Sequence, residues 1–356
     1  MKLSLLAFST NTGLGIQTLE FYNHMKPHKV LVSDLSRFNK VETHHERYFQ
    51  PRITNGIPTN EDMEWLTDDV DVVFICETPL NYHLYRAAKQ KKVAVVQQYN
   101  YEFLDYFRKP NETPPTVLAA PSTWNTNIVD RLGIAPVMDW PVPVNRKLVP
   151  FREIKECKTF VHLIGRPAVH DRNGTLSFLK AAIELGDQFK YKIFLQPPTD
   201  EKAKEYFEPV RAKLEEAKQH VSIEIIENTP NYQDIYASGD VMVIPRRYGG
   251  LCLPAQEALS AGIPVIMTDL PPNNSLLPRE WLGAAKQVSA FTAHTAIPIH
   301  EIEHNELVGT MRQFEDNEFM RVANEKANEI AESLSWKTLA SKYEEWLKES
   351  IKLARQ

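Results

Sequence analysis

Two arginines, Arg166 and Arg172, stand six residues apart in the loop that follows the apolar run Thr159–Ile164. A guanidinium group can hold a phosphate through paired hydrogen bonds, and ligands of doubly wound sheets bind beyond the carboxyl ends of the strands. Asn173 and Gly174 complete the loop before the next helical stretch. The pattern predicts a phosphate-binding loop, with two solvated surface arginines as the alternative.

A second loop, Thr10–Gly15, directly follows the first apolar run of the chain. Gly13 and Gly15 would let the backbone approach a ligand closely, and a helix that begins here favours an anionic group at its N-terminus. The loop lacks the third glycine of the dinucleotide-binding fingerprint. An anion-binding loop and a tight turn without a ligand are therefore both open.

The most informative segment runs from Pro245 to Val265. An expected strand ends at Pro245, the pair Gly249–Gly250 follows, and a helix is expected to begin with Pro254 as its first residue and Glu257 in its opening turn. In order and spacing, residues 253–265 resemble the signature of glycosyltransferase family 4 and the related group 1 glycosyltransferases of the GT-B fold.

The resemblance covers nearly the whole chain. Residues 12–15 are similar to the glycine-rich first loop of that family, and residues 140–143 to its interdomain linker. Residues 165–174 are similar to its phosphate loop, with Arg172 in place of the usual lysine, and Ser335-Trp336 to the start of its C-terminal helix.

This resemblance implies an enzyme that moves a sugar from a nucleoside-diphosphate-sugar donor to an acceptor hydroxyl, with retention of configuration and without a metal ion. Cationic groups and the start of the helix at Pro254 would stabilise charge on the leaving diphosphate, and Glu257 would accept hydrogen bonds from the ribose. The residues expected to be catalytic are Arg166, Arg172 and, on the acceptor side, Glu102. The residues expected to bind the donor are Gly13, Gly15, Arg166, Arg172, Asn173, Tyr248, Gly250, Leu251, Pro254 and Glu257.

Two departures from the family pattern bear on the chemistry. Gly249 stands where the family has the first glutamate of its E-x7-E pair, so the carboxylate that usually contacts the donor sugar is absent. The segment Gln97–Glu102 stands where a histidine often follows the fourth strand. The first departure bears on which sugar is transferred, and the second on the acceptor side. By resemblance the donor is expected to be a UDP- or GDP-sugar, with a hexose or a pentose, and no further cofactor or metal is expected.

Apolar runs alternate with amphipathic stretches in both halves of the chain, which predicts βαβ units and parallel sheets. Four prolines between positions 136 and 150 predict a stiff connector rather than a regular element. Two long helices are expected at the end, Asn305–Glu332 and Trp336–Ala354. The expected strands are Leu3–Phe8, Lys29–Asp34, Asp71–Cys76, Val93–Gln97, Val117–Ala120, Thr159–Ile164, Lys192–Gln196, Val221–Ile226, Val241–Ile244 and Pro264–Thr268.

These elements predict an α/β protein with two Rossmann-like, doubly wound domains. By resemblance the architecture is GT-B, in which the two domains face each other across a cleft and the C-terminal helix crosses back to the N-terminal domain. The expected acceptor-side domain comprises residues 1–143 and 336–356. A linker, 144–157, leads to the expected nucleotide-sugar-binding domain, 158–335.

Composition excludes several classes of protein. The 356 residues are 43% hydrophobic and 24% charged, which is typical of a soluble globular protein, and no apolar run reaches the roughly 20 residues that span a membrane. A net charge of −5 argues against binding nucleic acid by charge alone. Cys76, Cys157 and Cys252 are odd in number and widely spaced, which predicts reduced thiols.

A cytoplasmic location is expected. Peripheral contact with a membrane is the alternative, because the basic stretch Arg86–Lys92 could contact anionic lipid. The pair His44-His45 is expected to be exposed rather than to bind a metal. The acceptor favoured is a glycan, a lipid-linked or a small molecule, and the oligomeric state is open. Two other functions compete: a transferase that acts on a hydroxyl-bearing nucleic-acid base, and a sugar-nucleotide-binding module that has lost turnover.

Overall fold

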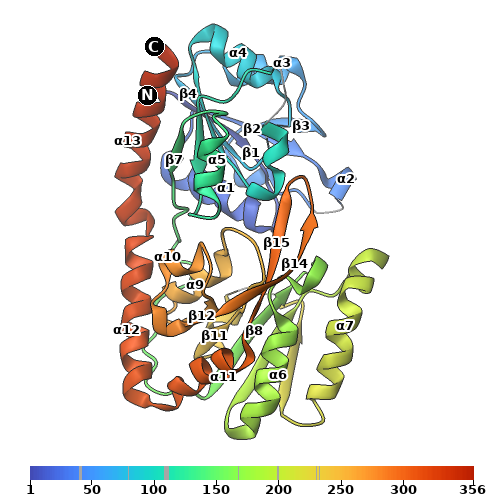
Figure 1. Cartoon of the computed structure of the whole chain (residues 1–356). Coiled ribbons are helices and arrows are strands. Elements are labelled where there is room, and N and C mark those ends of the chain that lie inside the picture. Colours follow the sequence, from blue (N-terminus) through green and yellow to red (C-terminus); the bar gives the residue numbers. More distant parts are fainter. Residues whose placement is uncertain are drawn as a thin grey trace. The chain divides into compact units, whose positions relative to one another are not determined.

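The structure is a computed structural model that describes residues 1–39, 42–78, 80–107, 112–166, 168–198, 200–229, 231 and 233–356. The chain forms two compact units (Figure 1). The first comprises Met1–Pro143, Ala293–Thr295 and Trp336–Gln356, and the second comprises Val144–Thr292 and Ala296–Ser335.

A parallel sheet of seven strands forms the centre of the first unit, in the order β3-β2-β1-β4-β5-β6-β7. Because the order reverses at β1 and β4, the loops after these two strands diverge and leave room for a ligand at the carboxyl edge. The strands are β1 (Leu3–Ala7), β2 (Lys29–Asp34), β3 (Arg52–Asn55), β4 (Val72–Cys76), β5 (Ala94–Gln98), β6 (Val117–Ala120) and β7 (Val137–Asp139).

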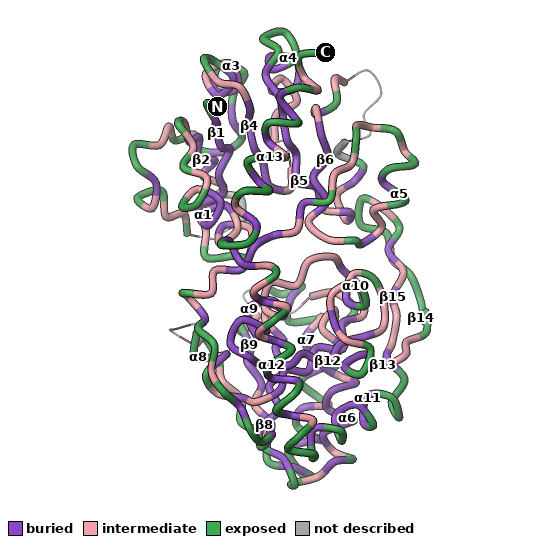
Figure 2. The backbone as a smooth tube through the Cα atoms, turned by 90° about the vertical axis from the view of Figure 1, so that its left-hand side faces the viewer, coloured by how far each residue is buried: buried purple, intermediate pink, exposed green. Residues whose placement is uncertain are grey.

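Helices cover both faces of this sheet, and successive strand residues point to opposite faces. Leu5 packs with helices α1 (Gly13–Met25) and α13 (Trp336–Arg355), whereas Leu6 packs with α3 (Asn60–Leu66) and α4 (His83–Lys91). The central strands are buried along their length (Figure 2). The remaining helical segments of this unit are α2 (Ser36–Asn39), η1 (His45–Arg47), η2 (Tyr101–Phe107) and α5 (Thr126–Arg131).

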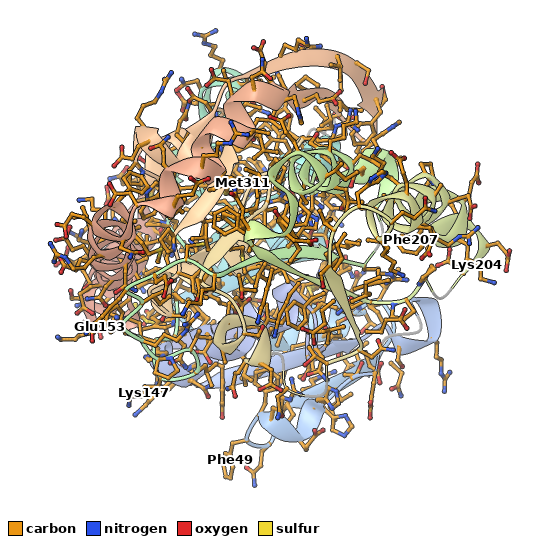
Figure 3. The ribbon with its side chains drawn as sticks, turned by 90° about the horizontal axis from the view of Figure 1, so that it is seen from below. Phe49, Lys147, Glu153, Lys204, Phe207 and Met311 are labelled. Carbon is orange, nitrogen blue, oxygen red and sulfur yellow. The ribbon has the colours of Figure 1, made fainter. Side chains whose placement is uncertain are left out.

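The second unit repeats the design with six parallel strands in the order β10-β9-β8-β11-β12-β13. Its core includes the fully buried Met311, labelled in Figure 3. The strands are β8 (Thr159–Gly165), β9 (Lys190–Leu195), β10 (Ile223–Glu227), β11 (Val241–Val243), β12 (Val265–Thr268) and β13 (Leu282–Gly283). The α-helices are α6 (Thr175–Leu185), α7 (Glu201–Ala217), α8 (Asp234–Ala237), α9 (Leu253–Ser260), α10 (Asn273–Leu276), α11 (His304–Arg312) and α12 (Asn317–Ser333).

An antiparallel hairpin, β14 (Ala285–Thr292) and β15 (Ala296–Ile302), follows the second sheet. Strand β14 is largely exposed, whereas Ile297, Ile299 and Ile302 on β15 are buried. Neither strand was among those predicted from the sequence.

The predicted α/β class with two parallel sheets is confirmed. Two local predictions are wrong. The proline-rich connector contains a strand, β7, which lies between Pro136 and Pro141 and pairs with β6. The single helix expected over Asn305–Glu332 is two helices, because the side chain of Asp316 accepts hydrogen bonds from backbone N–H groups of Glu318 and Phe319 and starts α12 there.

The segment 144–157 belongs to the second unit, and Val149, Ile154 and Cys157 are buried in its core. Within the described part of the chain, no helix combines the length and apolar character that crossing a membrane requires.

Candidate functional site

Two guanidinium groups of the second unit meet at Gly249, in the loop between β11 and α9. A Cβ atom on Gly249 would lie 2.7 Å from Nη2 of Arg172 and 2.8 Å from Nη2 of Arg246. The φ angle of Gly249 is +117°, a region that other residues rarely adopt. Glycine at this position therefore creates the space in which the two cations converge, where the family signature has a carboxylate.

Arg246 is the buried member of this pair. The residue is 7% exposed, and its Nη1 donates hydrogen bonds to the carbonyl oxygens of Gly250 (3.1 Å) and Leu251 (2.9 Å). Because a guanidinium keeps its proton in a protein, a positive charge is held beside the loop that leads into α9. Sequence reasoning did not single out Arg246, since an arginine after a strand is usually exposed and only packing shows otherwise.

Arg172, the other member of the pair, lies in the loop after β8. Its guanidinium carbon lies 5.3 Å from the centre of the Tyr248 ring, within the range of a cation–π contact. The Tyr248 hydroxyl donates to the carbonyl of Val169 at 2.7 Å, so the ring itself ties the two loops together. Tyr248 thus supports Arg172, in addition to its predicted place in the donor site.

The N-terminus of α6 is already occupied by a carboxylate of the chain. Asp171 accepts hydrogen bonds from the backbone N–H groups of Thr175 (2.9 Å) and Leu176 (2.8 Å). Burial raises the pKa of Asp171 to about 6, although these two donors favour the ionised form. An anion held by this loop would thus rely on the Arg172 side chain rather than on these two N–H groups.

Asn173 and Arg166 have different surroundings from Arg172. The Asn173 amide donates to the carbonyls of Leu163 (3.0 Å) and Ile164 (3.2 Å), which fastens the loop to the end of β8. The Arg166 side chain is 55% exposed and its Nη2 lies 3.7 Å from a carboxylate oxygen of Asp200. Among the predicted arginines, the structure brings Arg172 to the Gly249 cluster and places Arg166 in an exposed ion pair.

Helix α9 begins one residue earlier than predicted, at Leu253, so Pro254 is its second residue. The prediction that Glu257 lies in the opening turn is wrong, because the side chain falls in the second turn. Glu257 is 9% exposed, and its Oε2 accepts a hydrogen bond from the hydroxyl of Tyr236. A buried carboxylate oriented by a hydroxyl is suited to accept hydrogen bonds from a polar ligand.

In the first unit, the glycine loop is packed against itself. A Cβ atom on Gly15 would lie 2.0 Å from the carbonyl oxygen of Thr10, so the close approach made possible by this glycine is to the chain's own backbone. Gly13 is exposed at the start of α1. Glu102 is half-buried in η2, where its backbone N–H donates to Oδ1 of Asn100 at 3.3 Å.

The prediction that His44 is exposed is wrong. Its side chain is 17% exposed, and Nε2 lies 2.9 Å from Nδ2 of Asn11. A second contact, from Arg47 Nη2 to Oδ1 of Asn11 at 2.6 Å, holds the first loop against η1. Among the residues that the structure describes, no group of three or more His, Cys, Asp or Glu is placed to hold a metal ion.

Residues 160–295 match the family model of glycosyl transferases group 1. The structure superposes on HepE of Anabaena, solved in complex with UDP, with a TM-score of 0.72 at 11% identity over 98% of this chain and 100% of that one. The fold is GT-B.

Two other solved structures are similar over nearly their full length. Sucrose-phosphate synthase of Thermosynechococcus elongatus gives a TM-score of 0.65 at 12% identity over 98% of both chains. The lipopolysaccharide outer core galactosyltransferase WaaB gives 0.62 at 15% identity over 97% of this chain and 98% of the other. No curated protein matches by sequence. The segment that matches the family model, residues 160–295, contains Arg172, Arg246 and Gly249, so the family match and the cationic cluster coincide.

Proposed function

We propose that this protein is a glycosyltransferase that transfers a sugar from a nucleoside-diphosphate sugar to an acceptor hydroxyl. The observation that carries the proposal is the convergence of Arg172 and Arg246 on Gly249, inside the segment that matches group 1 glycosyltransferases. Two guanidinium groups close to one point favour an anion between them, and a diphosphate leaving group carries the charge that such a site stabilises.

The roles of the remaining residues follow from their surroundings. Arg172 and Arg246 would bind the diphosphate, with Gly250 and Leu251 providing close backbone approach. Glu257, oriented by Tyr236, would accept hydrogen bonds from the ribose hydroxyls. Because the two guanidiniums can offset the charge on the diphosphate, we propose that the reaction proceeds without a metal ion and, by family resemblance, with retention of configuration.

UDP is the first nucleotide to test, because the similar HepE structures were solved with UDP and with UDP-glucose. The acceptor is proposed to be a glycan, a lipid-linked or a small molecule. Glu102 is proposed to act on the acceptor side, since it follows β5 at the carboxyl edge of the first sheet.

The proposal is tested by titrating UDP and GDP into the protein by calorimetry and by measuring slow hydrolysis of UDP- and GDP-sugars. Arg172→Ala should weaken binding of the nucleoside diphosphate, whereas Arg211→Ala, an arginine paired with Glu208 on the exposed face of α7, should leave it unchanged. Activity should survive EDTA. Failure of UDP and GDP to bind would refute the proposal, and binding without any hydrolysis or transfer would favour a module that has lost turnover.

A further inference from the structure

The hairpin β14–β15 contacts both loops that carry the proposed diphosphate site. The Phe291 ring lies edge-on to Tyr248, with centroids 5.0 Å apart, and 5.1 Å from the ring of His170. Tyr248 follows β11 and His170 follows β8, so one side chain of the hairpin bridges two segments that are far apart in sequence. Aromatic pairs at this separation attract each other beyond the burial of their surface.

Backbone hydrogen bonds join the same three segments through Arg247. Its N–H donates to the carbonyl of Arg172 at 2.9 Å, and its carbonyl accepts from the N–H of His300 on β15 at 2.9 Å. The guanidinium donates to the carbonyls of His170 (2.8 Å) and His300 (3.2 Å). The hairpin and both loops are therefore held as one assembly.

The loop that the hairpin contacts has a strained backbone. His170 and Asp171 are successive residues with φ angles of +58° and +49°, in the left-handed region that favours glycine. Such residues persist only where the surrounding structure holds them in place. Here the Phe291 ring and the Arg247 guanidinium contact His170 and hold it in place. Asp171 and Arg172 follow His170 directly in the chain.

We infer that the hairpin β14–β15 is a positioning element of the diphosphate site, in which Phe291 acts through Tyr248 to fix the guanidinium of Arg172. The inference rests on the proposed function, because it assumes that Arg172 binds the diphosphate. The Arg172 guanidinium lies on one face of the Tyr248 ring, so fixing the ring restricts the conformations that this long side chain can adopt. Phe291 itself need not touch the ligand.

The test compares Phe291→Ala with the conservative Phe291→Tyr and with Val288→Ala, a matched control at a 42%-exposed position of the same strand. The ligands are the nucleoside diphosphate that the wild-type protein binds, UDP or GDP, and the corresponding nucleoside. Since Arg172 acts on phosphate, Phe291→Ala should weaken diphosphate binding by about three- to tenfold and leave nucleoside binding unchanged. Phe291→Tyr and Val288→Ala should resemble the wild type.

A double-mutant cycle shows whether Phe291 acts through Arg172. The variant that combines Phe291→Ala with Arg172→Ala should bind the diphosphate no more weakly than Arg172→Ala alone. The inference would be overturned if the losses of diphosphate affinity in the two single variants simply added in the double variant. It would also be overturned if Phe291→Ala left the ratio of diphosphate to nucleoside affinity unchanged. In both cases the proposed function stands. A wild-type protein that binds neither UDP nor GDP would instead refute the proposed function. Should Phe291→Ala fail to fold, Phe291→Leu takes its place in the same comparison.

Discussion

Replacing Gly249 with alanine directly tests whether the Arg172–Arg246 pair binds the donor. The added Cβ would lie 2.7 Å and 2.8 Å from the two Nη2 atoms and 3.0 Å from Cζ of Arg246, and contacts shorter than 3.0 Å essentially never occur at a real Cβ. Arg246 is tied to two carbonyl oxygens and the Arg172 guanidinium lies against the Tyr248 ring, so the added atom forces at least one guanidinium out of its position. We expect the displaced guanidinium to lose its best contact with the diphosphate.

The size of the effect follows from the interaction that is lost. A hydrogen bond to a charged group contributes about 1.5–3 kcal/mol, so Gly249→Ala should weaken UDP binding by roughly 10- to 100-fold. The positive φ adds a conformational cost of about 1–3 kcal/mol to the folded state, which lowers the free energy of unfolding but not the affinity of the folded protein.

Calorimetric titration of UDP measures the affinity, and urea unfolding measures the stability. The matched control is Gly133→Ala, because Gly133 also has a positive φ, +62°, but an added Cβ would meet nothing within 4 Å. Gly133→Ala should lose stability and keep its affinity. Gly249→Glu, which restores the family's glutamate, should bind UDP more weakly still. Wild-type affinity in both folded Gly249 variants would refute the proposed role of the arginine pair.

Glu257→Ala should weaken binding of UDP by about 10- to 100-fold, because the proposed hydrogen bonds to the ribose are lost. Calorimetry with the folded variant checks this, and an affinity equal to that of the wild type would leave Glu257 a purely structural role. Arg172→Ala should lower kcat/KM by about 10²–10³-fold. Arg166→Ala should lower it less than tenfold, because Arg166 lies in an exposed ion pair. Steady-state kinetics in which Arg166→Ala loses more activity than Arg172→Ala would contradict the role proposed for Arg172. Burial lowers the pKa of His162 from its ordinary 6.5 to about 4. Between these pH values the unfolded chain binds more protons than the folded protein. The free energy of unfolding should therefore fall by up to about 3 kcal/mol as the pH falls from 7 to 4. Urea unfolding across that range should show a weaker pH dependence in His162→Gln, and identical profiles would count against the shift.

Regular packing explains which parts of the fold were predictable. A central strand of a parallel sheet is buried on both faces, so it appears in the sequence as an uninterrupted apolar run, and Lys29–Asp34 and Val117–Ala120 were predicted with the observed bounds. The edge strand β3 alternates between half-buried and exposed residues over four positions and gives no such run. Strand β7 is short and lies between prolines, and β14 is largely exposed.

The sequence by itself determined the α/β class, the two parallel sheets and the loops that carry the candidate chemistry. The reason is that the apolar runs of the buried strands and the spacing of residues 253–265 can each be recognised within a short stretch of the chain. Only the tertiary structure decided which arginines lie together. Arg172 and Arg246 are 74 positions apart, and they meet because β8 and β11 are neighbours in the sheet and Gly249 leaves space for both guanidiniums. Arg166, in the same loop as Arg172, turns to Asp200 instead. Side-chain direction and close approach depend on atoms from several segments at once, and no single stretch of sequence contains that information.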